Sequence, residues 1–222
     1  MKRQAKTHVW HQRHVNDFYV KQSVEQGYRS RSAYKLLEID EQDHLLKPGM
    51  VVVDLGCAPG GWCQVVAERL RGQGRIIGID LLEMTGMNHV TFIQGDFTEA
   101  DGLALMQAAL AGKTADLVLS DMAPNITGVI VTDQARSYLL AELALDFAAQ
   151  HLQPDGAFLV KVFQGTGFEA YMKAMRAVFG KVTARKPDAS RDRSREVYLL
   201  GRGLKANSAA VSASIESAPD LD

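Results

Sequence analysis

The sequence predicts an α/β protein in which helices cover both faces of a doubly wound, mostly parallel sheet. Two observations predict this class. Short apolar runs of strand character alternate with segments of helical periodicity, and a glycine-rich turn at residues 57–61 follows the first of these runs. The length of 222 residues suits one such domain with short appendages.

The first half of the chain predicts a helix followed by one β-α-β unit. Residues 30–46 place apolar side chains on one helical face, with Ser30 or Ser32 as the N-cap. The next elements are expected to be a strand at residues 50–56, a helix over 62–70 and a strand at 75–80.

The second half continues the alternation. Asp133 is expected to cap a long helix whose Leu139, Leu143 and Phe147 recur every fourth residue. The last helix carries an apolar stripe over residues 168–179 that core packing explains. Strands are expected at residues 90–96, 115–121, 156–163, 181–185 and 196–202, with a further helix through residues 103–110.

Several classes of protein do not fit this composition. No apolar run approaches the roughly 18 residues that cross a bilayer. Residues 1–14 carry charge but no apolar stretch, so they do not form a secretory signal and we expect a cytoplasmic protein. Cys57 and Cys63 are the only cysteines, and their spacing argues against both a disulfide framework and a zinc site. We expect them to be reduced packing residues, and we expect no metal.

The net charge of −1 conceals two basic segments. Residues 1–35 contain eight Lys and Arg against two acids, and residues 181–205 contain eight against three. Residues 36–180 between them contain nine against eighteen. Clustered basic residues of this kind are typical of surfaces that bind polyanions.

The segment D-L-G-C-A-P-G-G-W at residues 54–62 predicts a ligand site. Glycines at the end of a strand let a ligand approach the backbone amides of a helix N-terminus. The segment lacks the G-x-G-x-x-G spacing of dinucleotide sites and the Gly-Lys-Ser/Thr of a phosphate loop, and Pro59 removes an amide that a pyrophosphate would use. The expected ligand therefore carries little or no phosphate.

Acidic residues are expected at the carboxyl ends of four successive strands, namely Asp54, Asp80, Asp96 and Asp121. Such ends meet at one crevice of a parallel sheet, where open α/β sheets bind ligands. Asp80 follows the glycine turn by about twenty residues, where an acid accepts hydrogen bonds from ribose hydroxyls. One such Asp is ordinarily a turn or cap residue, but four in register favour a site for a cationic nucleoside. S-adenosylmethionine fits this description.

Lys161 interrupts the apolar strand A-F-L-V-K-V-F. An unpaired buried ammonium is costly, so this side chain must reach the strand end, meet a carboxylate or lose its proton. The plain alternative is a lysine that extends along the sheet margin into water. Lys35 and Glu196 are individually unremarkable and resemble surface charges.

Five motifs make the sequence recognisable: SRSAYKL at 30–36, DLGCAPGGW at 54–62, SDMAPNITG at 120–128, LVKVFQG at 159–165 and SREVYLL at 194–200. Through them the chain resembles the FtsJ (RrmJ) family of ribosomal RNA 2′-O-ribose methyltransferases. The resemblance implies a Rossmann-like class I S-adenosylmethionine-dependent methyltransferase with a seven-stranded sheet. It also implies a catalytic tetrad at Lys35, Asp121, Lys161 and Glu196. The implied cofactor residues are Gly60, Trp62, Asp80, Asp96 and Asp121.

The tetrad suits attack of a ribose 2′-hydroxyl on a sulfonium methyl group. Lys161 can take the hydroxyl proton only when it is neutral, and free lysine titrates near about 10.4. Alternatively, Lys161 stays charged and directs the lone pair of the hydroxyl toward the methyl group. Asp121 and Glu196 would then orient the ammonium and the hydroxyl.

The resemblance implies methylation of a uridine ribose in 23S ribosomal RNA within the 50S particle. We expect a monomer that binds RNA, and neither DNA nor membrane. Its parts would be a basic arm at residues 1–28, a methyltransferase domain at 29–205 and a disordered tail at 206–222. The arm and the segment with Arg191, Arg193 and Arg195 would hold phosphates. Alternatives are an enzyme acting on transfer RNA or an mRNA cap, and a non-catalytic RNA-binding assembly factor, which would not need the tetrad.

Overall fold

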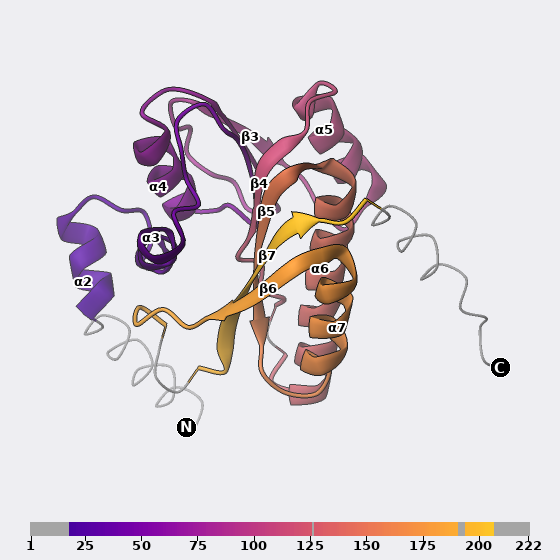
Figure 1. Cartoon of the computed structure of the whole chain (residues 1–222). Coiled ribbons are helices and arrows are strands. Elements are labelled where there is room, and N and C mark those ends of the chain that lie inside the picture. The colour runs from indigo at the N-terminus through magenta and orange to yellow at the C-terminus, as the bar shows by residue number, and fades with distance from the viewer. Residues whose placement is uncertain (1–17, 126, 191–193, 207–222) are drawn as a thin grey trace.

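The computed structural model describes residues 18–125, 127–190 and 194–206 (Figure 1). Within these residues the chain forms one seven-stranded sheet with helices on both faces, as the sequence predicts. The strands are β1 (Val51–Leu55), β2 (Arg75–Asp80), β3 (Val90–Gln94), β4 (Ala115–Ser120), β5 (Leu152–Phe163), β6 (Phe179–Arg185) and β7 (Glu196–Leu204). The helices are α2 (Phe18–Glu25), α3 (Ser32–Asp43), α4 (Gly61–Leu70), α5 (Ala100–Leu110), α6 (Ile130–His151) and α7 (Phe168–Val178).

The sheet is doubly wound, with strand order β3-β2-β1-β4-β5-β7-β6. Strand β1 pairs in parallel with both β2 and β4, and β7 is antiparallel to β5 and β6. The winding therefore reverses between β1 and β4. Open α/β sheets bind their ligands at this point, outside the carboxyl ends of the strands.

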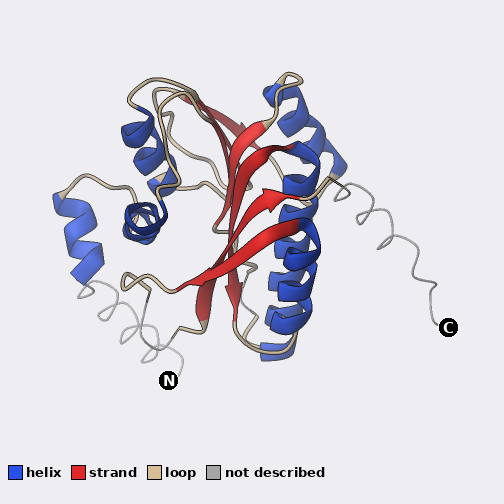
Figure 2. Cartoon of the chain, viewed as in Figure 1, coloured by secondary structure: helices blue, strands red, loops and turns tan. Residues whose placement is uncertain are grey.

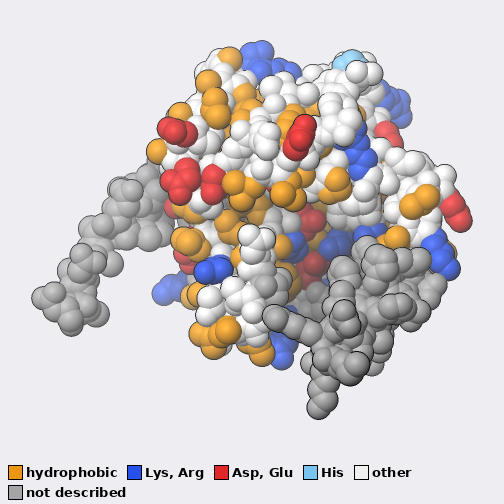
Figure 3. All heavy atoms as spheres, turned by 180° about the vertical axis from the view of Figure 1, so that it is seen from behind, with side chains coloured by type: hydrophobic (Ala, Val, Ile, Leu, Met, Phe, Trp, Pro, Cys, Tyr) orange, Lys and Arg blue, Asp and Glu red, His pale blue; other side chains and the backbone are white. Residues whose placement is uncertain are grey.

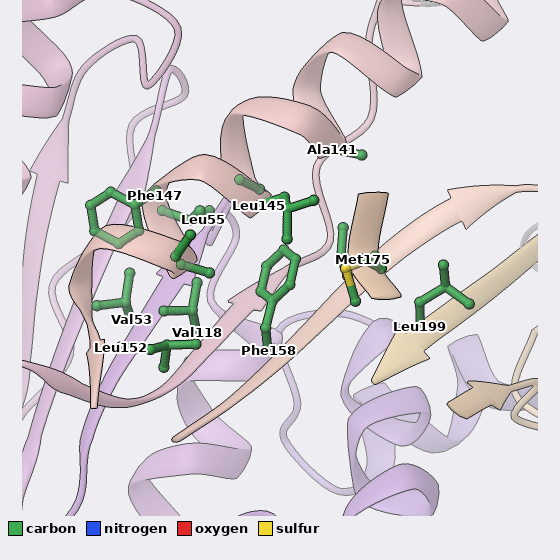
Figure 4. Packing of buried hydrophobic residues seen from close by; sticks show 14 of the residues in the cluster. Val53, Leu55, Val118, Ala141, Leu145, Phe147, Leu152, Phe158, Met175 and Leu199 are labelled. Atoms are coloured by element: carbon green, nitrogen blue, oxygen red, sulfur yellow. The ribbon is translucent and has the colours of Figure 1, made fainter. Parts of the chain in front are cut away.

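Helices cover the two faces unequally (Figure 2). Helices α5, α6 and α7 pack on one face, where Phe147, Phe158 and Met175 belong to the larger apolar core (Figure 4). Helices α3 and α4 pack on the other face and form a second core with the strands. Because side chains alternate along a strand, Val160 and Val162 of β5 enter the first core, and Lys161 faces α3 and α4.

Two predicted helix caps are wrong. The N-cap residue of α3 is Arg31, without a side-chain capping hydrogen bond, so neither Ser30 nor Ser32 caps the helix. The hydroxyls of the two serines lie 2.5 Å from each other. Helix α6 begins at Ile130, three residues before Asp133. The carboxylate of Asp133 instead accepts hydrogen bonds from backbone amides upstream of the helix, at Thr127 and Gly128.

The N-terminal part of the described chain is anchored on α3. The ring of Tyr19 in α2 lies 5.4 Å from the ring of Tyr34, and its hydroxyl donates to Glu38. Farther along, the Tyr28 hydroxyl donates to Glu68 of α4. The predicted basic arm and tail lie largely outside the described residues, as do Arg191 and Arg193. In the described parts of the chain, no helix is long and apolar enough to span a membrane.

Candidate active site

Four charged side chains meet at the carboxyl ends of β4 and β5. Asp121 directly follows β4, and Lys161 lies near the end of β5. In the antiparallel pairing of β5 with β7, Lys161 is opposite Tyr198 and Phe163 is opposite Glu196. Since side chains two apart on a strand share a face, Glu196 points to the same side as Lys161. Lys35 comes from α3, which covers that face.

The four side chains form two ion pairs. The Lys161 Nζ lies 2.9 Å from Asp121 Oδ1 and donates to the backbone oxygen of Asp121 at 2.6 Å. The Lys35 Nζ lies 2.6 Å from Glu196 Oε1. The four side chains are 7% to 18% exposed. Shielding from water makes such pairs interact more strongly than pairs at an open surface.

Tyr198 joins the two pairs. Its hydroxyl lies 2.9 Å from Asp121 Oδ1 and 3.3 Å from Glu196 Oε1, and with one proton it donates to one of them at a time. Its buried ring has its centroid 5.7 Å from that of Trp62 and 5.7 Å from the Lys35 ammonium. Sequence reasoning missed Tyr198, although its place two residues after Glu196 on a strand puts both on one face.

The surroundings of Asp121 keep its carboxylate ionised. Burial disfavours the charge, but the ammonium groups of Lys161 and Lys35 and the hydrogen bonds from Lys161 and Tyr198 outweigh it, so the pKa of Asp121 lies below its ordinary value of 3.8. Burial and the charges of Asp121 and Glu196 raise the pKa of Tyr198 well above 10.0. The tyrosine therefore remains a proton donor at neutral pH.

Asp54 does not line the crevice, and the expectation that it does is wrong. Its side chain is 0% exposed, and its Oδ2 accepts a hydrogen bond from the Cys63 thiol at 3.3 Å. It lies one residue before the end of β1 and shares the face of Val52, beneath α4. Burial raises the pKa of Asp54 from 3.8 to about 7, and the charges of Asp121 and Asp80 add to this shift. Cys63 and Cys57 are free and buried, as predicted.

The glycine turn closes tightly around the end of β1. Gly56 has φ +80°, and a Cβ there would lie 2.6 Å from Cγ of Met122, which follows β4. Gly60 has φ +108° and is the N-cap of α4. The first turn of a helix offers amide groups without intrahelical partners. The side chain of Trp62 points into the protein, where its Nε1 donates a hydrogen bond to the backbone carbonyl oxygen of Ser32 at 2.8 Å.

Asp80 and Asp96 lie at the carboxyl ends of the neighbouring strands. Asp80 is the last residue of β2. Its two carboxylate oxygens accept hydrogen bonds from the backbone amides of Ala58 and Leu82, each at 2.9 Å. Asp96 lies two residues after β3, and its Oδ1 accepts the Thr98 amide at 2.8 Å. A carboxylate oxygen has two lone pairs, so each of these groups retains acceptors for hydroxyl donors.

These residues fit a cationic nucleoside better than a nucleotide. Three acids lie at the ends of β2, β3 and β4, beside the first turn of α4, where helix amides have no intrahelical partners. The guanidinium of Arg29, which approaches the turn, donates to backbone oxygens of Pro59, Thr85 and Gly86. Among the described residues, no group of three or more His, Cys, Asp or Glu is placed to hold a metal ion.

The two basic segments of the sequence approach each other beside the ion pairs. The carboxylate of Glu38 in α3 accepts hydrogen bonds from both segments. One donor is the Tyr19 hydroxyl of α2, and the other is the backbone amide of Ala189 in the β6–β7 connection. The same connection supplies the Ser190 hydroxyl to Glu196 at 3.0 Å, and exposed Arg195 directly precedes Glu196. Figure 3 shows a recess in which acidic and basic side chains lie next to one another, bordered by hydrophobic side chains.

Comparison with known proteins identifies relatives by sequence. A sequence model of the family described as FtsJ-like methyltransferase matches residues 28–204. The ribosomal RNA large subunit methyltransferase E of Thiobacillus denitrificans is 60% identical over 201 residues, which are 90% of this chain and 91% of that protein. The protein of the same name from Neisseria meningitidis serogroup B is 54% identical over 203 residues, 91% of this chain and 98% of that protein.

Solved structures share the fold. A Plasmodium falciparum protein described as a candidate ribosomal RNA methyltransferase has a TM-score of 0.72 at 32% identity, and the match covers 80% of this chain and 98% of that chain. A candidate methyltransferase from Streptococcus mutans, crystallised with SAH, has a TM-score of 0.51 at 10% identity and covers 77% and 97%. The second likeness extends to the fold alone.

Proposed function

The chain belongs to the FtsJ-like methyltransferase family, and from this membership we propose that it methylates a ribose 2′-oxygen of large-subunit ribosomal RNA with S-adenosylmethionine. One structural observation carries the proposal. Two ion pairs that are largely shielded from water, Lys161 with Asp121 and Lys35 with Glu196, lie at the carboxyl ends of β4 and β5. A uridine of 23S RNA in the 50S particle is the proposed acceptor, and the shared name of the relatives supports the large-subunit assignment.

The cofactor residues are proposed from the donor set of the crevice. Asp80 and Asp96 would accept hydrogen bonds from ribose hydroxyls and an exocyclic amine, and Asp121 would face the cationic part. Gly60 and Trp62 would contribute backbone amides at the start of α4, since the Trp62 ring is engaged with Ser32 and Tyr198. S-adenosylmethionine supplies an electrophilic methyl group on a sulfonium when bound.

In the proposed reaction, the tetrad aligns the 2′-hydroxyl and manages its proton. Lys161 Nζ is held between two oxygens of Asp121, which fixes where its remaining N–H group points. Both partners are hydrogen-bond acceptors, and the carboxylate of Asp121 is ionised. This arrangement favours Lys161 as the group that directs a lone pair of the 2′-oxygen. The proton of the hydroxyl would then pass to water, because an ammonium cannot accept it. Alignment of this kind is worth up to about 7–11 kcal/mol in favourable cases.

The RNA is proposed to approach over α2, α3 and the β6–β7 connection, where the two basic segments meet. Arg195 is exposed there, and residues 1–17 of the predicted arm, which spans residues 1–28, precede α2. Basic side chains on this side would neutralise phosphates around the acceptor nucleotide, which an enzyme of this type must extrude to reach its ribose.

Transfer of labelled methyl groups to 50S particles, naked ribosomal RNA and transfer RNA tests the proposal. We expect 50S particles to be the best acceptor, and Lys161→Ala to lose at least about 10²-fold in turnover while keeping its fold and cofactor affinity. Lys161→Arg keeps the charge but cannot give up its proton, so it separates alignment from proton removal. Preference for transfer RNA would change the substrate, and absence of transfer to any RNA would favour the assembly-factor alternative.

A further inference from the structure

The side chain of Arg29 ties two loops together at the cofactor crevice. Its Nη1 donates to the Pro59 oxygen at 3.3 Å and to the Thr85 oxygen at 2.7 Å, and its Nη2 donates to the Gly86 oxygen at 3.1 Å. Pro59 belongs to the glycine turn, and the other two belong to the connection between β2 and β3, residues 81–89. A single planar guanidinium therefore satisfies three backbone carbonyls from two loops.

The contacts around Gly60 show how closely these parts approach. A Cβ on Gly60 would lie 2.9 Å from Met84 Sδ, 3.1 Å from Arg29 Nη1 and 3.1 Å from Met87 Cε. Met84 is buried, although it lies in a connection without helix or strand. Arg29 and two methionines of residues 81–89 therefore converge on the glycine that begins α4.

The same two loops are also joined at their base by Asp80. Its Oδ2 accepts the Ala58 amide of the glycine turn, and its Oδ1 accepts the Leu82 amide of residues 81–89. Asp80 is the proposed ribose acceptor, so the crevice has one cross-link at the binding group and a second at Arg29. Loss of the second would leave residues 83–89 attached mainly through the methionine contacts.

Hydrogen bonds to α4 fix the backbone around Arg29. The Arg29 amide donates to Gln64 Oε1 at 2.6 Å, and Gln64 Nε2 donates to the Gly27 oxygen at 2.9 Å. The chain then enters α3, which carries Lys35. The guanidinium therefore projects from a fixed backbone, which makes its three hydrogen bonds a restraint on the loops.

We infer that Arg29 is a positioning residue that fixes residues 81–89 against the glycine turn and thereby sets the affinity for S-adenosylmethionine. The inference rests on the proposed function, because it concerns the cofactor of that reaction. Arg29 acts through Pro59, Thr85 and Gly86, and its effect should appear in binding rather than in the chemical step.

Calorimetry, steady-state kinetics and amide hydrogen exchange of Arg29→Ala and Arg29→Lys test this inference. We expect Arg29→Ala to weaken S-adenosylmethionine binding at least about tenfold, with kcat at saturating cofactor within about twofold of the wild type. In the cofactor-free protein, exchange should rise in residues 83–89 and stay unchanged in α6. Arg29→Lys, which lacks the planar fork, should show a smaller effect in the same direction.

The matched control is Arg176→Ala, because Arg176 is exposed on α7, on the opposite face of the sheet. It should leave affinity and exchange unchanged. Unchanged affinity in folded Arg29 variants, or a loss confined to kcat, overturns the role of Arg29. A wild-type protein that does not bind S-adenosylmethionine overturns the proposed function instead, so the two failures are distinguishable. If Arg29→Ala does not fold, Arg29→Lys decides the question.

Discussion

Asp54 offers a direct test of the electrostatics beneath the crevice. Its carboxyl is fully buried, and among the described residues its Oδ1 has no hydrogen-bond partner. Burial raises the pKa of Asp54 from 3.8 to about 7, with Asp121 and Asp80 adding to the shift and the Cys63 thiol opposing it. The informative substitution is Asp54→Asn, which keeps the shape and an acceptor for Cys63 but cannot ionise.

The pKa shift sets the size and sign of the effect. Below pH 3.8 the carboxyl is protonated in both the folded and the unfolded chain, so it adds no pH dependence. Between 3.8 and about 7 the folded chain holds a proton that the unfolded chain releases, so the free energy of unfolding falls as the pH rises. Above about 7 both states are ionised and the loss is complete, at about 4 kcal/mol.

Urea denaturation of the cofactor-free protein at several values between pH 5 and pH 8 measures this loss. From pH 5 to pH 8 we expect the wild type to lose about 3 kcal/mol more than Asp54→Asn. The new amide has an unsatisfied NH2 group, which lowers the stability of the variant by a similar amount at every pH. The change between the two pH values is therefore the test, and the absolute stability is not.

The control for Asp54 is Asp101→Asn, which alters an exposed carboxyl in the first turn of α5. It should follow the wild-type dependence on pH. Parallel curves for the wild type and Asp54→Asn would refute the reasoning, because they would mean that Asp54 is already ionised at pH 5 and that the site beneath the crevice is more polar than its packing indicates.

Two further predictions concern the tetrad and the basic arm. Tyr198→Phe removes the hydroxyl that helps to lower the pKa of Asp121, so the acidic limb of the pH profile of kcat/KM should move to higher pH; an unmoved limb contradicts the role of Tyr198. Deleting residues 2–16 removes four Lys and Arg but leaves α2 intact, and should make the slope of log RNA affinity against log salt shallower by about three to four. Deleting the acidic residues 207–222 is the control, and equal slopes for both deletions would exclude the arm from binding.

The sequence predicted the parts of the site that depend on strand ends. Asp80 and Asp121 could be placed because carboxyl ends of parallel strands converge whatever the details of packing. Lys161 could be singled out because a charge inside an apolar strand requires a partner, and the structure supplies Asp121. Lys35 and Glu196 came only from the family resemblance, since nothing in their neighbours distinguishes them from surface charges.

Other features depend on packing that the sequence does not encode locally. Asp54 was misplaced because a shift of one residue on a strand changes the face, and Asp54 precedes the strand end whereas Asp80 is the strand end. Arg29 went unnoticed because its partners are backbone carbonyls of two loops, which any residue supplies. The cap predicted at Ser30 or Ser32 is wrong because α3 begins at Ser32, which makes Arg31 the N-cap residue.

In the proposed function, different charged groups around the site serve binding and chemistry. Each of the two ion pairs is neutral overall, so the tetrad as a whole exerts little attraction on either a cationic cofactor or an anionic RNA. In the proposed function, Asp80 and Asp96 would add to Asp121 the negative potential that a cationic cofactor needs. The basic segments that lie on either side of Glu38 would supply positive potential for RNA. In the proposed function, paired charges are therefore positioned for the hydroxyl without opposing the binding of either reactant.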